Sequence, residues 1–345
     1  ILNSLYGVLG LPVFRFYDID NAEATTLTGQ DLIKFTETIT NHYYNKELGD
    51  KKDYCIYTDT DSVFYPALPL VQKRYPDADV SNDEFMTEQI LLVAKEVQDF
   101  INNGYNYFAT KFLNVKGEHK FDIKQECVAK SAFWVTKKRY GQWIINDGGI
   151  KCDKLDVKGL DIVKSNFPPA MRDLMTKMLK DILADVDKEI IDEQIYEFKK
   201  KMKTLPIYDI ASPTGVRGLN KYKNTQRTKF KGKTIFTETR KGTPVHVKSA
   251  LVYNDLLKHF GCNDSEPIRN NEKIKWVYMK QNPLGVVNIA LKGYDDPDKI
   301  LEFVEQYIDR DKIFEGQLQK KINMFYDAMG WNFQAEKNEN VGKFF

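Results

Sequence analysis

The sequence predicts an α+β protein, built from helices and short antiparallel strands. Three stretches carry this prediction. Apolar side chains recur at helical spacing in residues 21–48 and again in 169–203, and a strand, a short turn and a second strand fill 54–65. The 345 residues are enough for two domains with cores, and the 42% hydrophobic fraction indicates a globular chain.

The first half of the chain should alternate helices and strands. Gly49 ends the first long helix, and a capping box from Ser81 to Glu84 begins the next. The expected elements are, in order, a helix end interrupted at Gly7 and Gly10, a strand at 13–17, a helix at 21–48, strands at 54–57 and 62–65, a helix at 83–105, and strands at 120–128, 133–140 and 142–146.

The second half should be mainly helical. Pro168 and Pro169 mark the start of a long helical stretch at 169–203, and helical periodicity returns at 300–329. Between them, 212–248 should be irregular with short strands.

Charge is unevenly distributed. The net charge is only +2, yet Arg217 to Lys248 holds ten Lys or Arg and a single acid, Glu238. Such a stretch suits contact with a phosphate backbone, and a solvated basic loop explains it equally well.

Cysteine spacing and hydropathy exclude several classes. Cys55, Cys127, Cys152 and Cys262 form no CxxC pair, which argues against a zinc site and a disulfide framework. No apolar run reaches the roughly 18 residues that cross a membrane, and the opening residues lack the pattern of a signal peptide. We expect a cytoplasmic protein without membrane partners.

The most specific chemical feature is the turn Thr58-Asp59-Thr60-Asp61 between two short strands. Two carboxylates held two residues apart are hard oxygen ligands of the kind that Mg²⁺ prefers. An ordinary solvated turn is the alternative, because Asp and Thr are common in turns.

Four short segments resemble known motifs in a known order. They are Asn3-Ser4-Leu5-Tyr6-Gly7, Tyr57-Thr58-Asp59-Thr60-Asp61-Ser62-Val63, Lys137-Lys138-Arg139-Tyr140 and Lys158-Gly159-Leu160-Asp161. They resemble, respectively, the end of the fingers motif, the third palm motif, the KKRY motif and the K-G-L-E stretch that opens the thumb in family B DNA polymerases. The resemblance covers essentially the whole chain and is strongest to about residue 165.

Later segments most resemble the thumb of T-even-like phage replicative polymerases. They are Ile210-Ala211-Ser212, Pro244-Val245-His246, Leu251-Val252-Tyr253-Asn254 and Asn282-Pro283-Leu284-Gly285. The resemblance implies a fingers remnant at 1–20, a palm at 21–163 with an antiparallel sheet and helices on one face, a mostly helical thumb at 164–335 and a tail at 336–345. Fingers and exonuclease domains would be largely absent, and a phage protein would act in the host cytoplasm.

The resemblance implies DNA-directed DNA synthesis by nucleotidyl transfer with two Mg²⁺ ions. Asp61 would be the principal metal ligand, and Asp59 a second ligand or an organiser of the site. Asn3 and Tyr6 would lie beside the nascent base pair, and Glu126 would be a supporting carboxylate.

It also implies contacts with primer–template DNA. Lys138 would contact the primer near its 3′ end. Lys158 and Gly159 would contact the duplex backbone at the junction of palm and thumb. The residues assigned to DNA in this way are Lys137, Lys138, Arg139, Tyr140, Lys158 and Gly159.

Other parts of the family pattern have no match. The lysine that opens the fingers motif would precede Ile1, and the first palm motif, D-x-x-S-L-Y-P-S, is absent from the chain. We therefore expect the Mg²⁺ ions to be shared with a carboxylate outside this chain. We also expect the chain to be inactive alone and to need the N-terminal polymerase part, in the same gene or as a split subunit; a split gene, an excised intein and a truncated read all fit this break.

In the phage polymerases that the chain resembles, the extreme C-terminus docks on a sliding clamp, which would make Phe344-Phe345 a clamp peptide; a frayed tail or a Phe pair packed on the thumb is the alternative. Two other functions compete with DNA synthesis. One is a subunit that holds DNA with a vestigial palm, against which the intact Asp59 and Asp61 argue. The other is a metal nuclease, which would need more clustered acids and histidines than this sequence offers.

Overall fold

The computed structural model describes residues 7–230 and 233–332, without the side chains of 224–230, 233–235 and 238. The chain forms two compact units, which are described separately. One contains 1–130 and 143–154, and the other contains 131–142 and 155–345. None of the helices in the described ranges is both long and apolar enough to cross a membrane.

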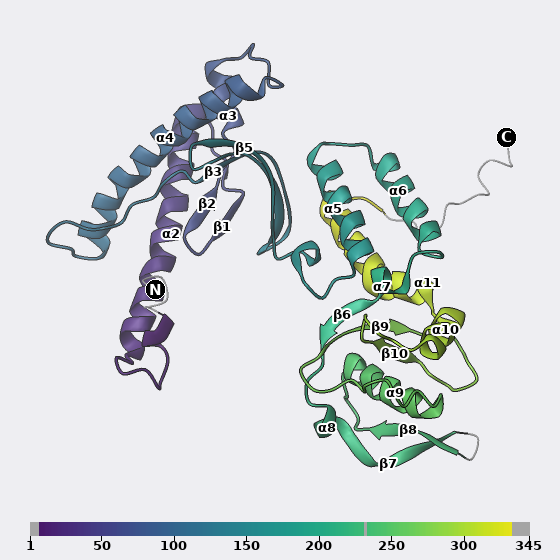
Figure 1. Cartoon of the computed structure of the whole chain (residues 1–345). Helices are drawn as coiled ribbons and strands as arrows, with labels where there is room; N and C mark the ends of the chain where they lie inside the picture. The colour runs from purple at the N-terminus through teal and green to yellow at the C-terminus, as the bar shows by residue number, and fades with distance from the viewer. Residues whose placement is uncertain (1–6, 231–232, 333–345) are drawn as a thin grey trace, which may run out of the picture. The chain divides into compact units, whose positions relative to one another are not determined.

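The first unit is built on two long helices. Its elements are α2 (Ile19–Leu48), β1 (Tyr57–Asp59), β2 (Ser62–Phe64), α3 (Leu68–Arg74), α4 (Asp83–Tyr107) and the π-helical η1 (Phe108–Phe112) (Figure 1). The Asp18 side chain caps the start of α2 by accepting a hydrogen bond from the Asn21 N–H, and Gly49 ends the helix with φ 77°.

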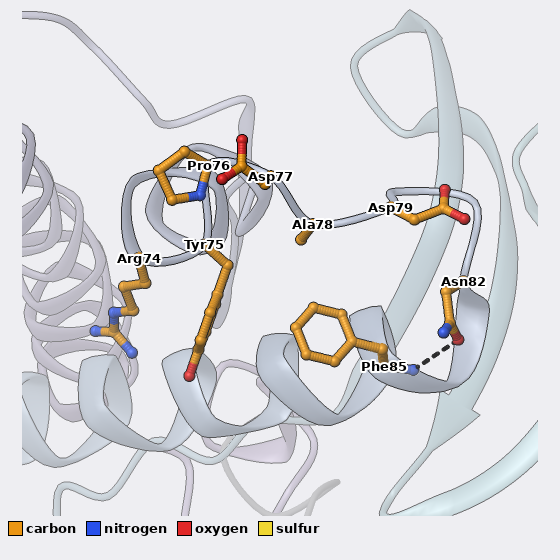
Figure 2. Close-up of a pocket in the computed structure, with 8 residues that line it drawn as sticks. All are labelled: Arg74, Tyr75, Pro76, Asp77, Ala78, Asp79, Asn82 and Phe85. Atoms are coloured by element: carbon orange, nitrogen blue, oxygen red, sulfur yellow. Dashed lines mark hydrogen bonds between the residues drawn. The ribbon is translucent and has the colours of Figure 1, made fainter.

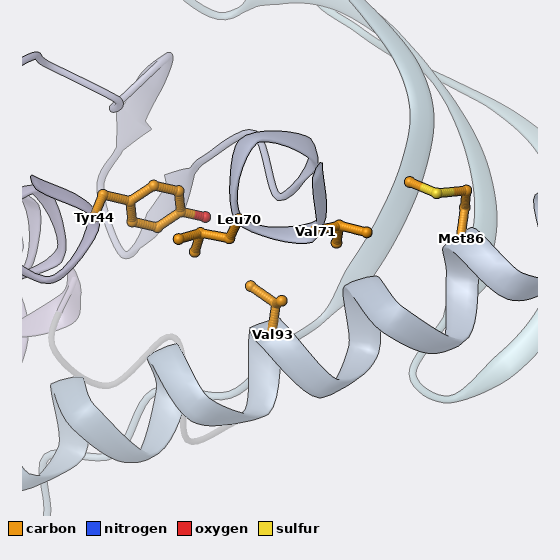
Figure 3. Packing of buried hydrophobic residues seen from close by; sticks show 5 residues of the cluster. All are labelled: Tyr44, Leu70, Val71, Met86 and Val93. Atoms are coloured by element: carbon orange, nitrogen blue, oxygen red, sulfur yellow. The ribbon is translucent and has the colours of Figure 1, made fainter. Parts of the chain in front are cut away.

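The core of this unit lies where α2, α3 and α4 meet. Tyr44 of α2, Leu70 and Val71 of α3, and Met86 and Val93 of α4 are all buried (Figure 3). Because β2 contacts α2, this helical layer supports the hairpin that carries the two aspartates.

Three further strands form one sheet in the order β3-β4-β5. They are β3 (Cys127–Thr136), β4 (Arg139–Asp147) and β5 (Ile150–Lys158). Two-residue connections at 137–138 and 148–149 join them as successive hairpins.

The second unit combines helices with two small antiparallel sheets. Strand β9 (Lys273–Tyr278) lies between β10 (Asn288–Leu291) and β6 (Ser212–Gly215). Strand β7 (Lys223–Phe230) pairs with β8 (Lys233–Thr239) in the other sheet, and helix α9 (Val245–His259) packs against β10 and β8 (Figure 1). Its other helical elements are η2 (Asp161–Val163), α5 (Pro169–Leu183), α6 (Lys188–Lys201), α7 (Ile207–Ile210), α8 (Leu219–Tyr222), α10 (Asp298–Tyr307), α11 (Arg310–Ile313), η3 (Phe314–Gln319) and α12 (Lys320–Met329).

The mixed α+β class is confirmed, and several element limits are corrected. Residues 13–17 form turns and not a strand, with the Tyr17 N–H donating to the Phe14 carbonyl. The N-cap of α4 is Asn82 and not Ser81, because the Asn82 side chain accepts from the Phe85 N–H. No strand covers 120–126, and β3 begins at Cys127.

The two helical stretches expected in the second half are confirmed, and each consists of more than one helix. The stretch 169–203 divides into α5 and α6 around Asp185, whose φ of 56° lies in the left-handed region. The stretch 300–329 contains α10, α11, η3 and α12. In the sheet, the strands expected at 133–140 and 142–146 are not separated at Gly141, because β4 runs through Gly141 and the turn lies at Lys137 and Lys138.

Candidate metal-binding turn and DNA-contact segments

The predicted carboxylate hairpin is present. Strands β1 and β2 pair antiparallel, and Asp59 opposite Ser62 is their last pair before the turn. The turn is tight: Thr60 has φ 54°, and the Asp61 N–H donates to the Asp59 carbonyl at 2.6 Å. The Ser62 hydroxyl donates to the same carbonyl at 3.1 Å, so the backbone between the two aspartates is fixed by local bonds.

The two carboxylates have different surroundings. One oxygen of Asp59 accepts from the Tyr57 hydroxyl at 3.3 Å, and the other accepts from the Thr60 hydroxyl at 3.0 Å. Asp61 is exposed, and its carboxylate has no hydrogen bond or ion pair with any residue that the structure describes. Asp59 is therefore oriented by the protein, whereas Asp61 is available to a cation.

This turn fits part of a Mg²⁺ site. Exposed carboxylates on a rigid turn can bind Mg²⁺ together with waters and substrate phosphates. Within the described residues, no group of three or more Asp, Glu, His or Cys side chains is placed to hold a metal ion. Glu126 is exposed just before β3, and its carbonyl accepts from the Gly148 N–H at 2.8 Å. A pair of ions would need ligands beyond Asp59 and Asp61.

The first two and the last two residues of the Lys137-Lys138-Arg139-Tyr140 segment lie in different environments. Lys137 and Lys138 are exposed and form the turn between β3 and β4, with φ 60° at Lys138. Arg139 and Tyr140 begin β4. The Arg139 guanidinium donates to Asp161 at 2.9 Å, and Tyr140 is only 8% exposed, with its ring 5.9 Å from that of Trp134. Two residues thus offer charge to the outside, and two hold the turn in place.

Lys158 and Gly159 lie at the end of β5. The Lys158 ammonium pairs with Asp156 at 3.3 Å while the side chain stays 57% exposed. Gly159 has φ 65°, and a Cβ built on it would lie 2.0 Å from the carbonyl oxygen of Lys138. The structure therefore brings together two segments to which the motif resemblance separately assigns contact with DNA.

The remaining predicted residues divide by location. Asp59, Asp61 and Glu126 belong to the first unit, and residues 137–140, 158 and 159 belong to the second. Asn3, Tyr6, Phe344 and Phe345 lie outside the described residues.

The basic stretch contains a hairpin. Strands β7 and β8 pair from Lys223 opposite Thr239. Asp255 of α9, only 9% exposed, anchors this hairpin by accepting from the Thr237 N–H at 2.5 Å and from its hydroxyl at 3.1 Å. The sequence analysis did not identify Asp255, because a single acid within a mainly apolar segment gives no functional signal by itself.

Two of the thumb-like motif residues stabilise loops. The Asn254 side chain donates to the Ile268 carbonyl at 2.9 Å and accepts from its N–H at 2.7 Å. Asn282 likewise accepts from the Val286 N–H at 3.0 Å and donates to the Val286 carbonyl at 2.7 Å. These amides support the fold and offer no site chemistry.

A pocket of about 480 Å³ opens between α3 and the start of α4 (Figure 2). Tyr75 and Phe85 face it with ring centroids 5.6 Å apart, and Arg74 at its edge pairs with Glu96. It contains none of the predicted site residues, and its lining shows no grouping of catalytic side chains.

Comparison with known proteins agrees with the resemblance to family B DNA polymerases. The model of DNA polymerase family B matches residues 1–69, which include the carboxylate hairpin. The "DNA-directed DNA polymerase" of Enterobacteria phage T4 is 24% identical over 97% of this chain, and that of Escherichia phage RB69 is 26% identical over 97%. The chain is related to the family B DNA polymerases.

The relationship is to part of a longer protein. The chain spans 37% of the length of each phage polymerase, so it resembles a partial family B polymerase of the T-even type. A "DNA polymerase" of Thermococcus kodakarensis is 27% identical over 65% of the chain. The predicted resemblance is confirmed, and nearly all of this chain takes part in it.

Proposed function

We propose that the chain forms part of the palm and the thumb of a DNA-directed DNA polymerase that acts on primer–template DNA and dNTPs in the cytoplasm. The observation that carries the proposal is the asymmetric carboxylate pair, in which Asp59 is oriented by Tyr57 and Thr60 while Asp61 stays exposed. The family match includes this hairpin. The palm limits at 21–163 and the thumb limits at 164–335 belong to the same proposal.

The reaction is attack by the primer 3′-hydroxyl on the α-phosphorus of a dNTP, with pyrophosphate as the leaving group. Bound Mg²⁺ would stabilise charge on the attacking and leaving oxygens. Asp61 supplies the exposed ligand oxygens, and Asp59 holds the turn and adds a second ligand. Asn3 and Tyr6 check the new base pair, and Glu126 supports the site. Further ligands come from the N-terminal polymerase part.

DNA is held through its backbone. Lys137 and Lys138 project from the β3–β4 turn, Lys158 lies at the end of β5, and the 217–248 stretch adds further cations. Lysine contacts with phosphates give affinity without sequence preference, as a replicative enzyme requires. Docking of Phe344 and Phe345 on a sliding clamp is part of the same proposal.

The decisive experiment is primer extension with Mg²⁺ and dNTPs. The chain is assayed alone and mixed with a polypeptide that carries the missing first palm motif, fingers and exonuclease. We expect extension only in the mixture, and its loss with Asp61→Ala. Asp77→Ala is the matched control, because Asp77 is also an exposed aspartate of the first unit but lies in the α3–α4 loop.

Each result decides between functions. Extension by the chain alone would contradict the need for a second part. An inactive mixture that still binds DNA would favour the subunit that only holds DNA, and Mg²⁺-dependent cleavage of DNA lost with Asp61→Ala would favour the nuclease.

A binding experiment tests the DNA contacts separately. Replacing Lys137 and Lys138 together by Ala should weaken binding to primer–template DNA. It should also reduce the slope of log K against log salt by about 0.9 for each phosphate that the variant no longer neutralises. Lys95→Ala is the control, because Lys95 is an exposed lysine on α4 of the first unit that pairs with Asp99. Equally weakened binding in both variants would indicate a nonspecific charge effect.

A further inference from the structure

Asp161 is the centre of an ion-pair cluster that joins three segments of the second unit. One carboxylate oxygen lies 2.9 Å from Arg139 at the start of β4 and 3.1 Å from Lys321 of α12. The other oxygen lies 3.0 Å from Lys164 in the loop after η2. With 8% of its surface exposed, Asp161 is largely removed from water.

The cluster holds three cations and one carboxylate, so it keeps a net positive charge even with Asp161 ionised. Neutralising the carboxylate would leave the three cations close together with no counter-charge between them. The Arg139 side chain is 29% exposed, the Lys321 side chain 33% and the Lys164 side chain 45%, so all three cations keep partial contact with water while they pair with Asp161. The hydrogen-bonded ion pair with Asp161 directs the Arg139 guanidinium towards this cluster.

Apolar and backbone contacts reinforce the same attachment. Phe133 of β3 packs edge to face on Phe325 of α12, with centroids 5.4 Å apart. Gly159, two residues before Asp161, lies against the Lys138 carbonyl. The end of the β3–β4 hairpin is thus held on α12 by one aromatic pair and one ion-pair cluster.

We propose that Asp161 is a positioning residue that fixes the Lys137-Lys138 turn for contact with DNA. It acts through Arg139, which ties the first residue of β4 to the start of the helical part of this unit. The proposal rests on the proposed function for the identity of the DNA ligand. It requires no contact between Asp161 and DNA.

This role can be separated from simple electrostatics by the sign of the effect. Asp161→Asn removes one negative charge and releases lysines, so an electrostatic role alone predicts tighter DNA binding. A positioning role predicts weaker binding, because the turn lysines lose their fixed placement. Asp161→Glu keeps the charge and matches the K-G-L-E form of this stretch, and should restore binding.

The test uses the 345-residue chain with a fluorescein-labelled primer–template duplex. Dissociation constants are measured for the wild type, Asp161→Asn, Asp161→Glu and the control Glu197→Gln. The control removes an equal charge from an exposed pair with Lys200 on α6. We expect the Kd of Asp161→Asn to be about tenfold higher than that of the wild type, which corresponds to about 1.4 kcal/mol of binding free energy. Asp161→Glu should lie within about twofold of the wild type, and Glu197→Gln should bind no more weakly than the wild type.

Amide hydrogen exchange at 137–140, measured without DNA, gives a second readout. Asp161→Asn should exchange faster there than the wild type, and Glu197→Gln should not. Equal or tighter DNA binding by Asp161→Asn together with unchanged exchange would overturn the proposal. If the wild type fails to bind DNA, the proposed function fails, and the exchange experiment still decides whether Asp161 positions the turn.

A milder variant covers the case in which Asp161→Asn does not fold. Arg139→Lys keeps the positive charge but loses the guanidinium fork. It should weaken DNA binding and accelerate exchange at 137–140 in the same direction. Wild-type values for both measurements would overturn the proposal.

Discussion

Gly159 lies against the backbone carbonyl of Lys138, where a Cβ would come within 2.0 Å of the oxygen. Its φ of 65° is also one that L residues rarely adopt. Any side chain at this position must therefore displace the turn that presents Lys137 and Lys138. The K-G pair at the end of β5 and the lysine turn form one structural feature, although they are separate motifs in the sequence.

Replacing Gly159 by Ala should destabilise the second unit and weaken DNA binding. We expect a loss of at least about 2 kcal/mol of unfolding free energy, because both the close contact and the positive φ oppose a Cβ. Urea denaturation measures the loss. Gly148→Ala is the matched control, since Gly148 has φ 57° with no atom within 4 Å of its Cβ position. Gly148→Ala should lose only about 1 kcal/mol of unfolding free energy. Equal losses in the two variants would show that the contact with the Lys138 carbonyl does not contribute to the cost at Gly159.

Tyr57→Phe should impair metal use without disturbing the fold. The Tyr57 hydroxyl orients Asp59, and loss of such support to a ligand typically costs about tenfold or more in metal affinity. The Mg²⁺ concentration for half-maximal extension in the reconstituted reaction should rise about tenfold. Tyr54→Phe removes a similar hydroxyl, which donates to Asp50 at 2.6 Å away from the turn, and should leave the Mg²⁺ requirement unchanged. A similar rise in both variants would argue against a special role for Tyr57.

Asp255→Asn should loosen the basic hairpin. The carboxylate accepts two bonds from Thr237, and an amide can offer only one oxygen. Exchange of the Thr237 N–H should become about tenfold faster, since hydrogen bonds to charged groups contribute about 1.5–3 kcal/mol. Thr237→Val removes only the hydroxyl bond and should have a smaller effect. Unchanged exchange in Asp255→Asn would show that strand pairing alone holds β8.

The Asp161 cluster should make the free energy of unfolding depend on pH in the acidic range. Burial by itself would raise the pKa of Asp161, but Lys164 and Lys321 outweigh burial and hold this pKa below its usual range. A carboxyl whose pKa is lower in the folded state stabilises fully above the unfolded pKa of about 4 and loses this contribution as the pH falls through the folded value. The difference in urea stability between wild type and Asp161→Asn should therefore shrink below about pH 4. A difference that grew in acid would contradict the ion-pair role.

Strong periodicity made several elements predictable. Apolar side chains at helical spacing identified α2, and the capping signals around 81–84 placed the start of α4 to within one residue. The carboxylate hairpin was predictable because two aspartates between short apolar strands are a local pattern. In each case neighbouring residues supply the stabilising bonds, such as the Thr60 and Ser62 hydroxyls around Asp59.

The β3–β4 turn was misplaced for a physical reason. No Gly, Asn or Pro marks residues 137–138, and Lys138 takes a positive φ that lysine seldom adopts. Packing of the Lys138 carbonyl on Gly159 and burial of Tyr140 accompany this conformation. Helix α9 was missed because Asp255 and Ser249 occupy buried positions and weaken its apolar pattern.

The α+β class, the carboxylate turn and the relationship to family B DNA polymerases could be predicted from the sequence alone, because each depends on short patterns of residues close along the chain. The pairing of Asp161 with both Arg139 and Lys321, and the contact of Gly159 with Lys138, depend on how the chain folds. Those partners come from separate strands and helices of the second unit. Their contacts arise from packing over long sequence separations, which local pattern does not encode.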